Sequence, residues 1–295
     1  MKFRKNLRKS MKAKLSKKQN QEILDFMREV AVTAGKKLVR YQKKLDTLSV
    51  SIKQAQGVAS EADHASEELI IKAIKKKFPE HSILAEEDAF KKFGDGKEAL
   101  DHFKKEEWCW IIDPLDGTHN FLAGMDYFAV CICLAWRGVP QVGLIHRPVN
   151  GETFHAILGE GAWVSHLDSG KRAQKIHATK SSKKLRESML VTGFATEKGE
   201  VFDREFDQFR KIMGKSRGIR RMGSAALDLC YVASGIFSGF WERGLAPWDV
   251  AASGLICLES GVKVTNYEGQ KFHPFQKSII AARNPVYSEL ISLFD

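Results

Sequence analysis

The segment Trp110–Phe121 carries two carboxylates that could bind a metal ion. It reads WIIDPLDGTHNF, so a hydrophobic run leads directly into Asp113 and Asp116. Like charges this close are costly unless a cation neutralises them, and carboxylate oxygens suit Mg²⁺. Gly117 allows a ligand to approach the backbone closely, and a helix or tight turn opening at Thr118 would offer N–H groups to an anion. DPLDG is also common in ordinary turns, and that alternative stays open for these five residues alone.

Two further acidic positions could complete such a site. Glu86 and Glu87 follow the apolar run Ile83–Ala85, which places a second acidic pair at the end of a strand; taken alone, this would be a solvated surface pair. Asp249, in WDVAA, lies where a helix is expected to begin and could simply cap it. The chain contains no Walker A or HExxH motif. A metal-assisted phosphoryl transfer would need no nucleophilic side chain, because positioning of the substrate and neutralisation of its charge account for most of the catalysis.

The motifs WIIDPLDGTHNF, AEED and WDVAA occur in the order and approximate spacing of the inositol monophosphatase family, which the chain resembles over residues 20–295. GSAALDLCYVASG and FWERGLAPWDVAA are most similar to its bacterial inositol-1-monophosphatase branch. The resemblance implies an α/β (α+β) fold, the layered α-β-α-β-α sandwich of the inositol monophosphatase and fructose-1,6-bisphosphatase superfamily. It also implies a Mg²⁺-dependent, lithium-sensitive phosphatase that is commonly a homodimer.

The same resemblance implies a set of metal ligands. Glu86, Asp113 and the Leu115 carbonyl match a first metal site. Asp113, Asp116 and Asp249 match a second, with Asp113 bridging the two. Glu86 also matches a ligand of a weaker third site, so two or three Mg²⁺ are expected, and Glu87 lies just behind the ligands.

The resemblance assigns the remaining site residues to catalysis and substrate binding. A metal-bound water, activated by Glu86 and the Thr118–Asp63 pair, is expected to attack phosphorus, while the leaving alcohol meets the second metal and a water near Asp249. The expected substrate contacts are the N–H groups of Gly117 and Thr118 for the phosphate, and Ser224, Ala225, Glu242 and Asp249 around the alcohol.

The expected substrate is a small polyol phosphate, with myo-inositol 1-phosphate leading. Fructose-1,6-bisphosphatase, nucleotide 3′-phosphatase and histidinol-phosphatase activities share the same metal carboxylates and stay open. Glu242 favours a polyol, although it could instead be a solvated residue paired with Arg243. Three features depart from the family: Ala85 replaces a glycine, His119 replaces a threonine, and the loop 122–127 differs.

Basic residues are concentrated at the N-terminus. The 295-residue chain has a net charge of +11, yet residues 1–18 hold nine Lys/Arg and no acid, leaving 38 basic against 36 acidic residues elsewhere. We therefore expect a basic arm over residues 1–19 and a catalytic domain over 20–295. The arm could bind nucleic acid, which would make the chain an RNA- or ribosome-associated factor, or it could be a solvated tail.

The overall composition predicts a cytoplasmic protein. No apolar run reaches the ~18–20 residues of a membrane span, and no apolar stretch follows the basic start as in a signal peptide. The five cysteines have no metal-binding spacing and are expected to be buried thiols.

Helices and strands must bring these separated motifs together. Apolar spacing predicts helices at 20–44, 63–78, 203–214, 223–234 and 249–260, with Pro79 ending the second. From Trp108 the runs WCWIID, FAVCICLAW, PQVGLIHRP and ETFHAILG are typical of strands, as are GVKVTN and SIIAAR nearer the C-terminus. Residues 88–106 are expected to form a surface loop or short helix, and GEG at 159–161 a hairpin turn.

Overall fold

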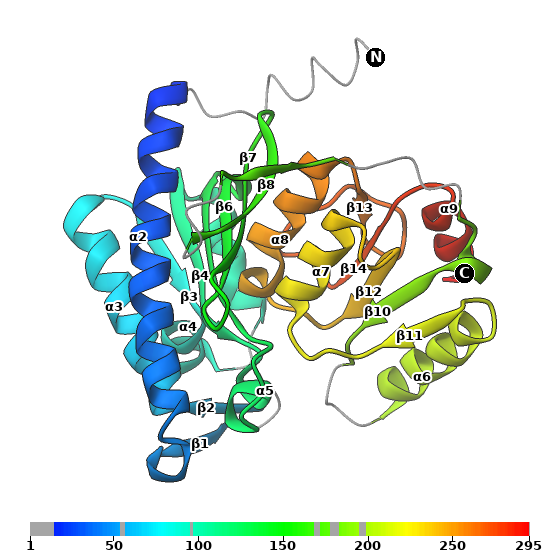
Figure 1. Ribbon diagram of the computed structural model, residues 1–295, viewed down its shortest axis with the longest axis horizontal. Helices are drawn as coiled ribbons and strands as arrows, with labels where there is room; N and C mark the ends of the chain where they lie inside the picture. The colour runs from blue at the N-terminus through cyan, green and yellow to red at the C-terminus, as the bar shows by residue number, and fades with distance from the viewer. Residues whose placement is uncertain are drawn as a thin grey trace.

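The computed structural model describes residues 15–53, 57–94, 97–167, 172–177, 183–194 and 199–294. Two β-sheets alternate with three layers of helices, as Figure 1 shows. The expected α-β-α-β-α sandwich is therefore confirmed. Its layers are, in order, helices α2 and α3, a seven-stranded sheet, helices α7 and α8, a five-stranded sheet, and helices α6 and α9.

The first layer consists of α2 (Lys17–Gln42) and α3 (Glu61–Lys77). Both helices bury one apolar face against the seven-stranded sheet, which explains why their apolar spacing was a clear helical signal. Each starts with a capping box, in which Ser16 or Ser60 bonds reciprocally with the residue three positions later. Helix α2 thus begins inside the segment expected to form the basic arm, and residues 1–14 of that arm lie outside the described residues.

The seven-stranded sheet has the order β3-β4-β5-β6-β7-β8-β9, in which only the β3–β4 pair is parallel. Helices cover both faces of its centre, so β4 and β5 appear in the sequence as continuous apolar runs rather than alternating ones. The strands are β3 (Ser82–Ala85), β4 (Trp108–Asp116), β5 (Ala129–Trp136), β6 (Val139–Arg147), β7 (Glu152–Ile157), β8 (Gly161–His166) and β9 (Gln174–Ile176). The expected turn at 159–161 joins β7 to β8.

The central helices α7 (Ala225–Ser234) and α8 (Pro247–Ser260) fill the space between the sheets. Both are apolar on nearly every side because each contacts a sheet on either face. The five cysteines are free and buried, as expected. No described helix combines the length and the apolar character needed to cross a membrane.

The five-stranded sheet has the order β11-β10-β12-β14-β13 and lies between the central helices and the last layer. Its strands are β10 (Met189–Thr192), β11 (Gly218–Arg220), β12 (Gly239–Arg243), β13 (Lys263–Thr265) and β14 (Ser278–Ala282). On its outer side, Ile212 of α6 (Glu200–Met213) and Tyr287 of α9 (Val286–Ile291) belong to a core shared with Trp241 of β12.

Short elements surround the ends of β3 and β4. The hairpin β1–β2 (Val50–Lys53, Gly57–Ser60) lies beside α5 (Thr118–Leu122) (Figure 1). Residues 88–106, expected to be a loop or short helix, contain most of α4 (Glu86–Phe93) and a 3₁₀ segment, η2 (Lys97–Lys105).

Candidate active site

Strand β4 delivers two of the acidic residues, and α8 delivers the third. Asp113 and Asp116 are only 2% and 8% exposed, and the pairing of β4 with β5 shifts register between them. Asp249 is the third residue of α8, and its Oδ2 accepts a hydrogen bond of 2.7 Å from the N–H of Ala246, the N-cap residue. Asp249 is therefore not itself the N-cap. One oxygen from each of the three carboxylates lies within 4.8 Å of the others.

This cluster has the donors and the charge that a divalent cation requires. Burial, and then the nearby carboxylates of Glu86, Asp116 and Asp249, raise the pKa of Asp113 well above its usual range. Burial also raises the pKa of Asp116 to about 6, although hydrogen bonds from Ser224 and the backbone of Ala226 oppose the change. Ionised carboxylates in such a place need a compensating positive charge. A metal bound by hard oxygen ligands would supply it, so the residues present fit such an ion.

Glu86 lies beside this cluster rather than within it. It is the first residue of α4, and its charge raises the pKa of both Asp113 and Asp63. The start of α4 is held by Glu67 of α3, whose carboxylate accepts hydrogen bonds from the N–H groups of Glu87 (2.8 Å) and Asp88 (2.9 Å). Burial raises the pKa of Glu67 to about 7. Sequence reasoning missed Glu67, although a Glu on the apolar side of an amphipathic helix was a usable signal.

Asp63 and Thr118 come together as expected. Thr118 Oγ1 lies 3.0 Å from Asp63 Oδ1 and 3.1 Å from the Leu115 carbonyl, to either of which it can donate. The other carboxylate oxygen of Asp63 accepts from the N–H (2.8 Å) and the hydroxyl (2.5 Å) of Ser60. Burial raises the pKa of Asp63 despite these bonds. The carboxylate is thus fixed in one orientation with Oδ1 facing Thr118.

Gly117 occupies the N-cap position of α5 with φ = 91°, in the left-handed region. A Cβ there would lie 3.0 Å from the carbonyl oxygen of Tyr127 and 3.3 Å from that of Gly223. Both the backbone angle and the space therefore require glycine at the turn that follows Asp116. Thr118 opens the short helix α5, as the motif suggested.

Of the four residues expected around the alcohol, Asp249 belongs to the acidic cluster, and Ser224, Ala225 and Glu242 lie near it. The hydroxyl of Ser224 donates to Asp116 Oδ2, and a backbone hydrogen bond from Ala225 acts on the same carboxylate. Glu242 lies on β12, and burial followed by the charge of Asp249 raises its pKa well above the usual range. Ser224 therefore bonds to the carboxylate cluster, and Glu242 places a further buried carboxyl group near it.

Glu242 is not the solvated, Arg243-paired residue of the alternative interpretation. It is 9% exposed, and the guanidinium of Arg243 instead donates to Glu205, with Nε 2.9 Å from Oε1. Its carboxylate packs against Gly193, where a Cβ would lie 2.3 Å from either oxygen. Gly193 must therefore stay small for Glu242 to keep its position.

Polar residues that sequence reasoning did not single out hold the loops around the site. The Asn120 side chain donates to the carbonyls of Tyr127 and Met222, each at 2.8 Å. The Tyr127 hydroxyl donates to Asp228 at 2.7 Å, and burial raises the pKa of Asp228 to about 8. Asp228 is the single acidic residue in the otherwise apolar sequence of α7, and this feature could have predicted that it has a buried polar partner. The divergent loop 122–127 is held by Gln42, whose amide donates to the Met125 carbonyl at 2.7 Å.

Comparisons with known proteins agree with this geometry. The family model for the inositol monophosphatase family matches residues 19–294. "Nus factor SuhB" of Pseudomonas aeruginosa is 34% identical over 274 residues, covering 92% of this chain and 95% of the relative. "Inositol-1-monophosphatase" of Rhizobium meliloti is 36% identical, covering 84% and 86%. The crystal structure of the extragenic suppressor protein suhB from Bartonella henselae superposes with a TM-score of 0.79 at 33% identity, covering 93% of this chain and 98% of that one. The chain belongs to the inositol monophosphatase family.

Proposed function

We propose that this chain is a Mg²⁺-dependent phosphomonoesterase that hydrolyses a small polyol phosphate, with myo-inositol 1-phosphate as the leading substrate. The observation that carries the proposal is the cluster of the buried Asp113 and Asp116 with the half-buried Asp249, and the carboxyl group of Glu242 close to it. The cluster supports the choice of a metal-assisted reaction. Glu242 supports the choice of a substrate rich in hydroxyl groups.

The residues that would hold the ions are Glu86, Asp113, the Leu115 carbonyl, Asp116 and Asp249, and two or three Mg²⁺ are proposed. Bound Mg²⁺ would neutralise the phosphoryl oxygens and make a water molecule more acidic. Small cations compete for such oxygen-lined sites, so we also propose inhibition by millimolar Li⁺.

The protein's own contribution to the attack is a proton path. Thr118 Oγ1 lies within hydrogen-bond distance of Asp63 Oδ1 and can pass a proton from the attacking water to it. Because Ser60 holds the other oxygen of Asp63, the accepting atom is fixed. Glu86, at the start of α4, completes the polar surroundings of that water. The bond from water oxygen to phosphorus forms as the bond from phosphorus to the alcohol oxygen breaks, and the alcohol takes a proton from a water near Asp249.

The remaining residues position the substrate. The N–H groups of Gly117 and Thr118 hold the phosphate at the end of β4. Ser224 and Ala225 form the wall at the start of α7, and Glu242 accepts hydrogen bonds from substrate hydroxyl groups. This arrangement favours a polyol leaving group, because a buried carboxyl group without such a partner would be costly.

A phosphate-release screen with the full chain tests this proposal. The substrates are myo-inositol 1-phosphate, fructose 1,6-bisphosphate, a nucleoside 3′-phosphate and histidinol phosphate, each measured with Mg²⁺ and with EDTA. We expect the highest kcat/KM for inositol phosphate, with no turnover in EDTA. A clear preference for another substrate would reject the polyol assignment, and no Mg²⁺-dependent turnover on any of them would reject the enzyme.

A second candidate function is association with transcription or RNA. It is favoured by relatives named Nus factor SuhB at 32–34% identity and by the nine Lys/Arg of residues 1–18. Binding of a fluorescent single-stranded RNA is expected to weaken steeply with salt, since each neutralised phosphate releases counterions. Equal RNA affinity for the full chain and for a chain lacking residues 1–14 would place any contact outside the arm.

We also propose a homodimer, which sedimentation equilibrium would report as twice the mass of the chain.

A further inference from the structure

Strand β3 leaves one edge of the seven-stranded sheet open. It pairs in parallel with β4 along Ser82–Ala85, and no other strand of the described chain pairs with it. The outward N–H and C=O groups of an edge strand are a template for a further strand, and proteins commonly block or use such edges. Residues 82–85 provide none of the proposed active-site side chains, so this edge is open to another role.

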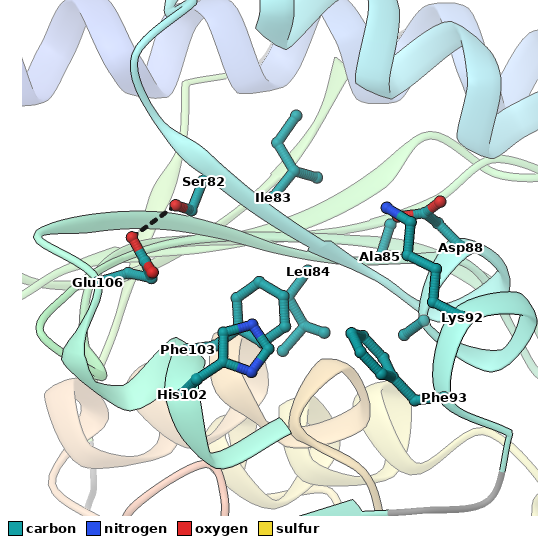
Figure 2. Close-up of a pocket in the computed structure, with 11 residues that line it drawn as sticks. Ser82, Ile83, Leu84, Ala85, Asp88, Lys92, Phe93, His102, Phe103 and Glu106 are labelled. Carbon is teal, nitrogen blue, oxygen red and sulfur yellow. Dashed lines mark hydrogen bonds and ion pairs between the residues drawn. The ribbon is translucent and has the colours of Figure 1, made fainter. Parts of the chain in front are cut away.

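Two pockets flank this edge, one on each face of the sheet. The first, of about 310 Å³, lies on the side of Leu84, where Phe93, His102 and Phe103 converge (Figure 2). The second, of about 420 Å³, lies on the side of Ile83, which packs with the core under α2 and α3. Both pockets are lined by Ile83, Asp88 and Lys92, so they adjoin each other across the strand.

The two pockets differ in chemistry. The first has apolar walls of Leu84, Phe93 and Phe103. Its charged lining is already paired, Asp88 with Lys92 and Glu106 with Ser82, so the pocket suits an apolar side chain. The second is lined by Lys75 and Lys92, and its carboxylate, Asp88, is already paired with Lys92 at 2.6 Å. The helix ends beside it are also basic: the last turn of α3 holds Lys75, Lys76 and Lys77, and that of α4 holds Lys91 and Lys92. This pocket suits an acidic side chain.

We propose that the open edge of β3 binds an extended peptide of a partner protein in which apolar and acidic residues alternate. The peptide adds a strand beside Ser82–Ala85 through main-chain hydrogen bonds. Because side chains alternate between the faces of a strand, its apolar residues enter the pocket beside Leu84 and its acidic residues the pocket beside Lys75. This interaction surface goes beyond the proposed phosphatase function.

Charge argues against the other possible occupants. The chain's own N-terminal arm carries seven Lys/Arg in residues 1–14 and no acid, so the lysine-lined pocket would repel it. A second copy paired edge to edge would bring two lysine-lined pockets together. Like charges facing each other across paired strands are destabilising. An acidic, apolar peptide is the occupant whose charge complements the groove.

Fluorescence anisotropy with a fluorescein-labelled (Leu-Asp)₃ peptide tests the proposal on the full chain. We expect binding of this peptide and at least tenfold weaker binding of a matched (Leu-Lys)₃ peptide. Lys75→Glu should weaken binding of the acidic peptide about five- to tenfold, because an attraction becomes a repulsion. Lys215→Glu, an equal charge change at an exposed residue beyond the other sheet, should leave binding unchanged. Equal melting temperatures of the two variants would show that both are folded.

Amide hydrogen exchange separates strand addition from loose charge attraction. The acidic peptide should slow exchange within residues 82–85, and the basic peptide should not. Equal affinity for both peptides, or binding with no added protection at 82–85, would overturn the proposal. Protection there that rises with protein concentration in the absence of peptide would assign the edge to a second copy and overturn it as well. Phosphatase activity is measured separately and does not depend on this result.

Discussion

Asp113 shows what burial within a cluster of carboxylates does to a single acidic residue. It is 2% exposed, and the N–H of Leu115 donates to its Oδ1 at 2.9 Å. Its strongest electrostatic neighbours are carboxylates, so its ionised form is unfavourable in the protein alone. Ionised Asp113 therefore lowers the free energy of unfolding of the protein, and a bound cation would compensate this cost.

Glu242 should govern the choice of substrate without supporting the reaction itself. Losing the hydrogen bond between the Glu242 carboxyl group and a substrate hydroxyl leaves that hydroxyl unsatisfied and costs about 1–3 kcal/mol, so Glu242→Ala should lower kcat/KM for myo-inositol 1-phosphate about 10- to 100-fold. The generic substrate p-nitrophenyl phosphate has no such hydroxyl, so kcat/KM for this substrate should fall only slightly. Steady-state kinetics on both substrates measures the difference.

Glu200→Gln provides the control for this experiment. Glu200 is exposed on α6 and pairs only loosely with Arg204, at 3.4 Å, so its variant should match the parent on both substrates. Equal losses on both substrates in Glu242→Ala would show that Glu242 supports the fold or the metal site. The polyol assignment would then lose its main support in the sequence.

Single residues were predictable from the sequence where they belonged to a motif, and not where they depended on contacts. Asp113, Asp116 and Asp249 were candidates because of their motifs, and the structure brings them together. The direction of the Ser224 hydroxyl, toward Asp116, could not be inferred because it depends on how the start of α7 meets the end of β4. Arg243 pairs with Glu205 of α6, some forty residues earlier in the chain, and nothing local indicated that partner.

At the scale of elements, the contact between α2 and β7 should make the fold sensitive to acid. His155 of β7 stacks on Trp163, and Arg28 of α2 donates to its Nε2 at 3.1 Å, which requires the neutral ring. Burial, together with the charge of Arg28, lowers the pKa of His155 to about 3. Between pH 6.5 and 3 the unfolded chain binds a proton that the folded one does not, so stability falls as the pH falls.

The expected loss from His155 alone is about 2 kcal/mol of unfolding free energy between pH 7 and pH 5. Urea denaturation at the two pH values should show a smaller loss for His155→Gln, whose amide oxygen can still accept from Arg28. His177→Gln, at an exposed position, serves as the control and should behave like the parent. An unchanged pH dependence in His155→Gln would contradict this explanation.

Elements with a long periodic or apolar signal were predictable, as were β13 and β14 from GVKVTN and SIIAAR, whereas β9 to β11 were not. The expected helices match α2, α3, α6, α7 and α8, and the apolar runs from Trp108 onward match β4 to β7. Strands β9 to β11 have only three or four residues each, too few for any period to appear in the sequence. Their existence depends on pairing with distant neighbours, as when β10 pairs with β11 and β12.

At the scale of the whole molecule, two truncations should separate the arm from the folded domain. Ser16 caps α2, and Leu15 packs against the core beneath it. Deleting residues 1–14 should therefore leave the phosphatase rate and melting temperature almost unchanged. Deleting residues 1–18 removes the cap and should cost about 1 kcal/mol or more, seen as a melting temperature lower by a few degrees. Equal melting temperatures for both truncations would show that the first turn of α2 does not stabilise the fold.

The most direct test of the whole account is a Mg²⁺ titration of phosphate release from myo-inositol 1-phosphate. Three proteins are compared: the parent, Asp113→Asn, and Asp207→Asn, a surface change at a residue paired with Arg210. We predict that the rates of the parent and Asp207→Asn rise to saturation with Mg²⁺ and vanish in EDTA. Asp113→Asn should stay at least about 10³-fold slower at every Mg²⁺ concentration, because several kcal/mol of transition-state stabilisation are lost. Full turnover in EDTA, or near-parental turnover by Asp113→Asn, would contradict a mechanism built on this carboxylate cluster.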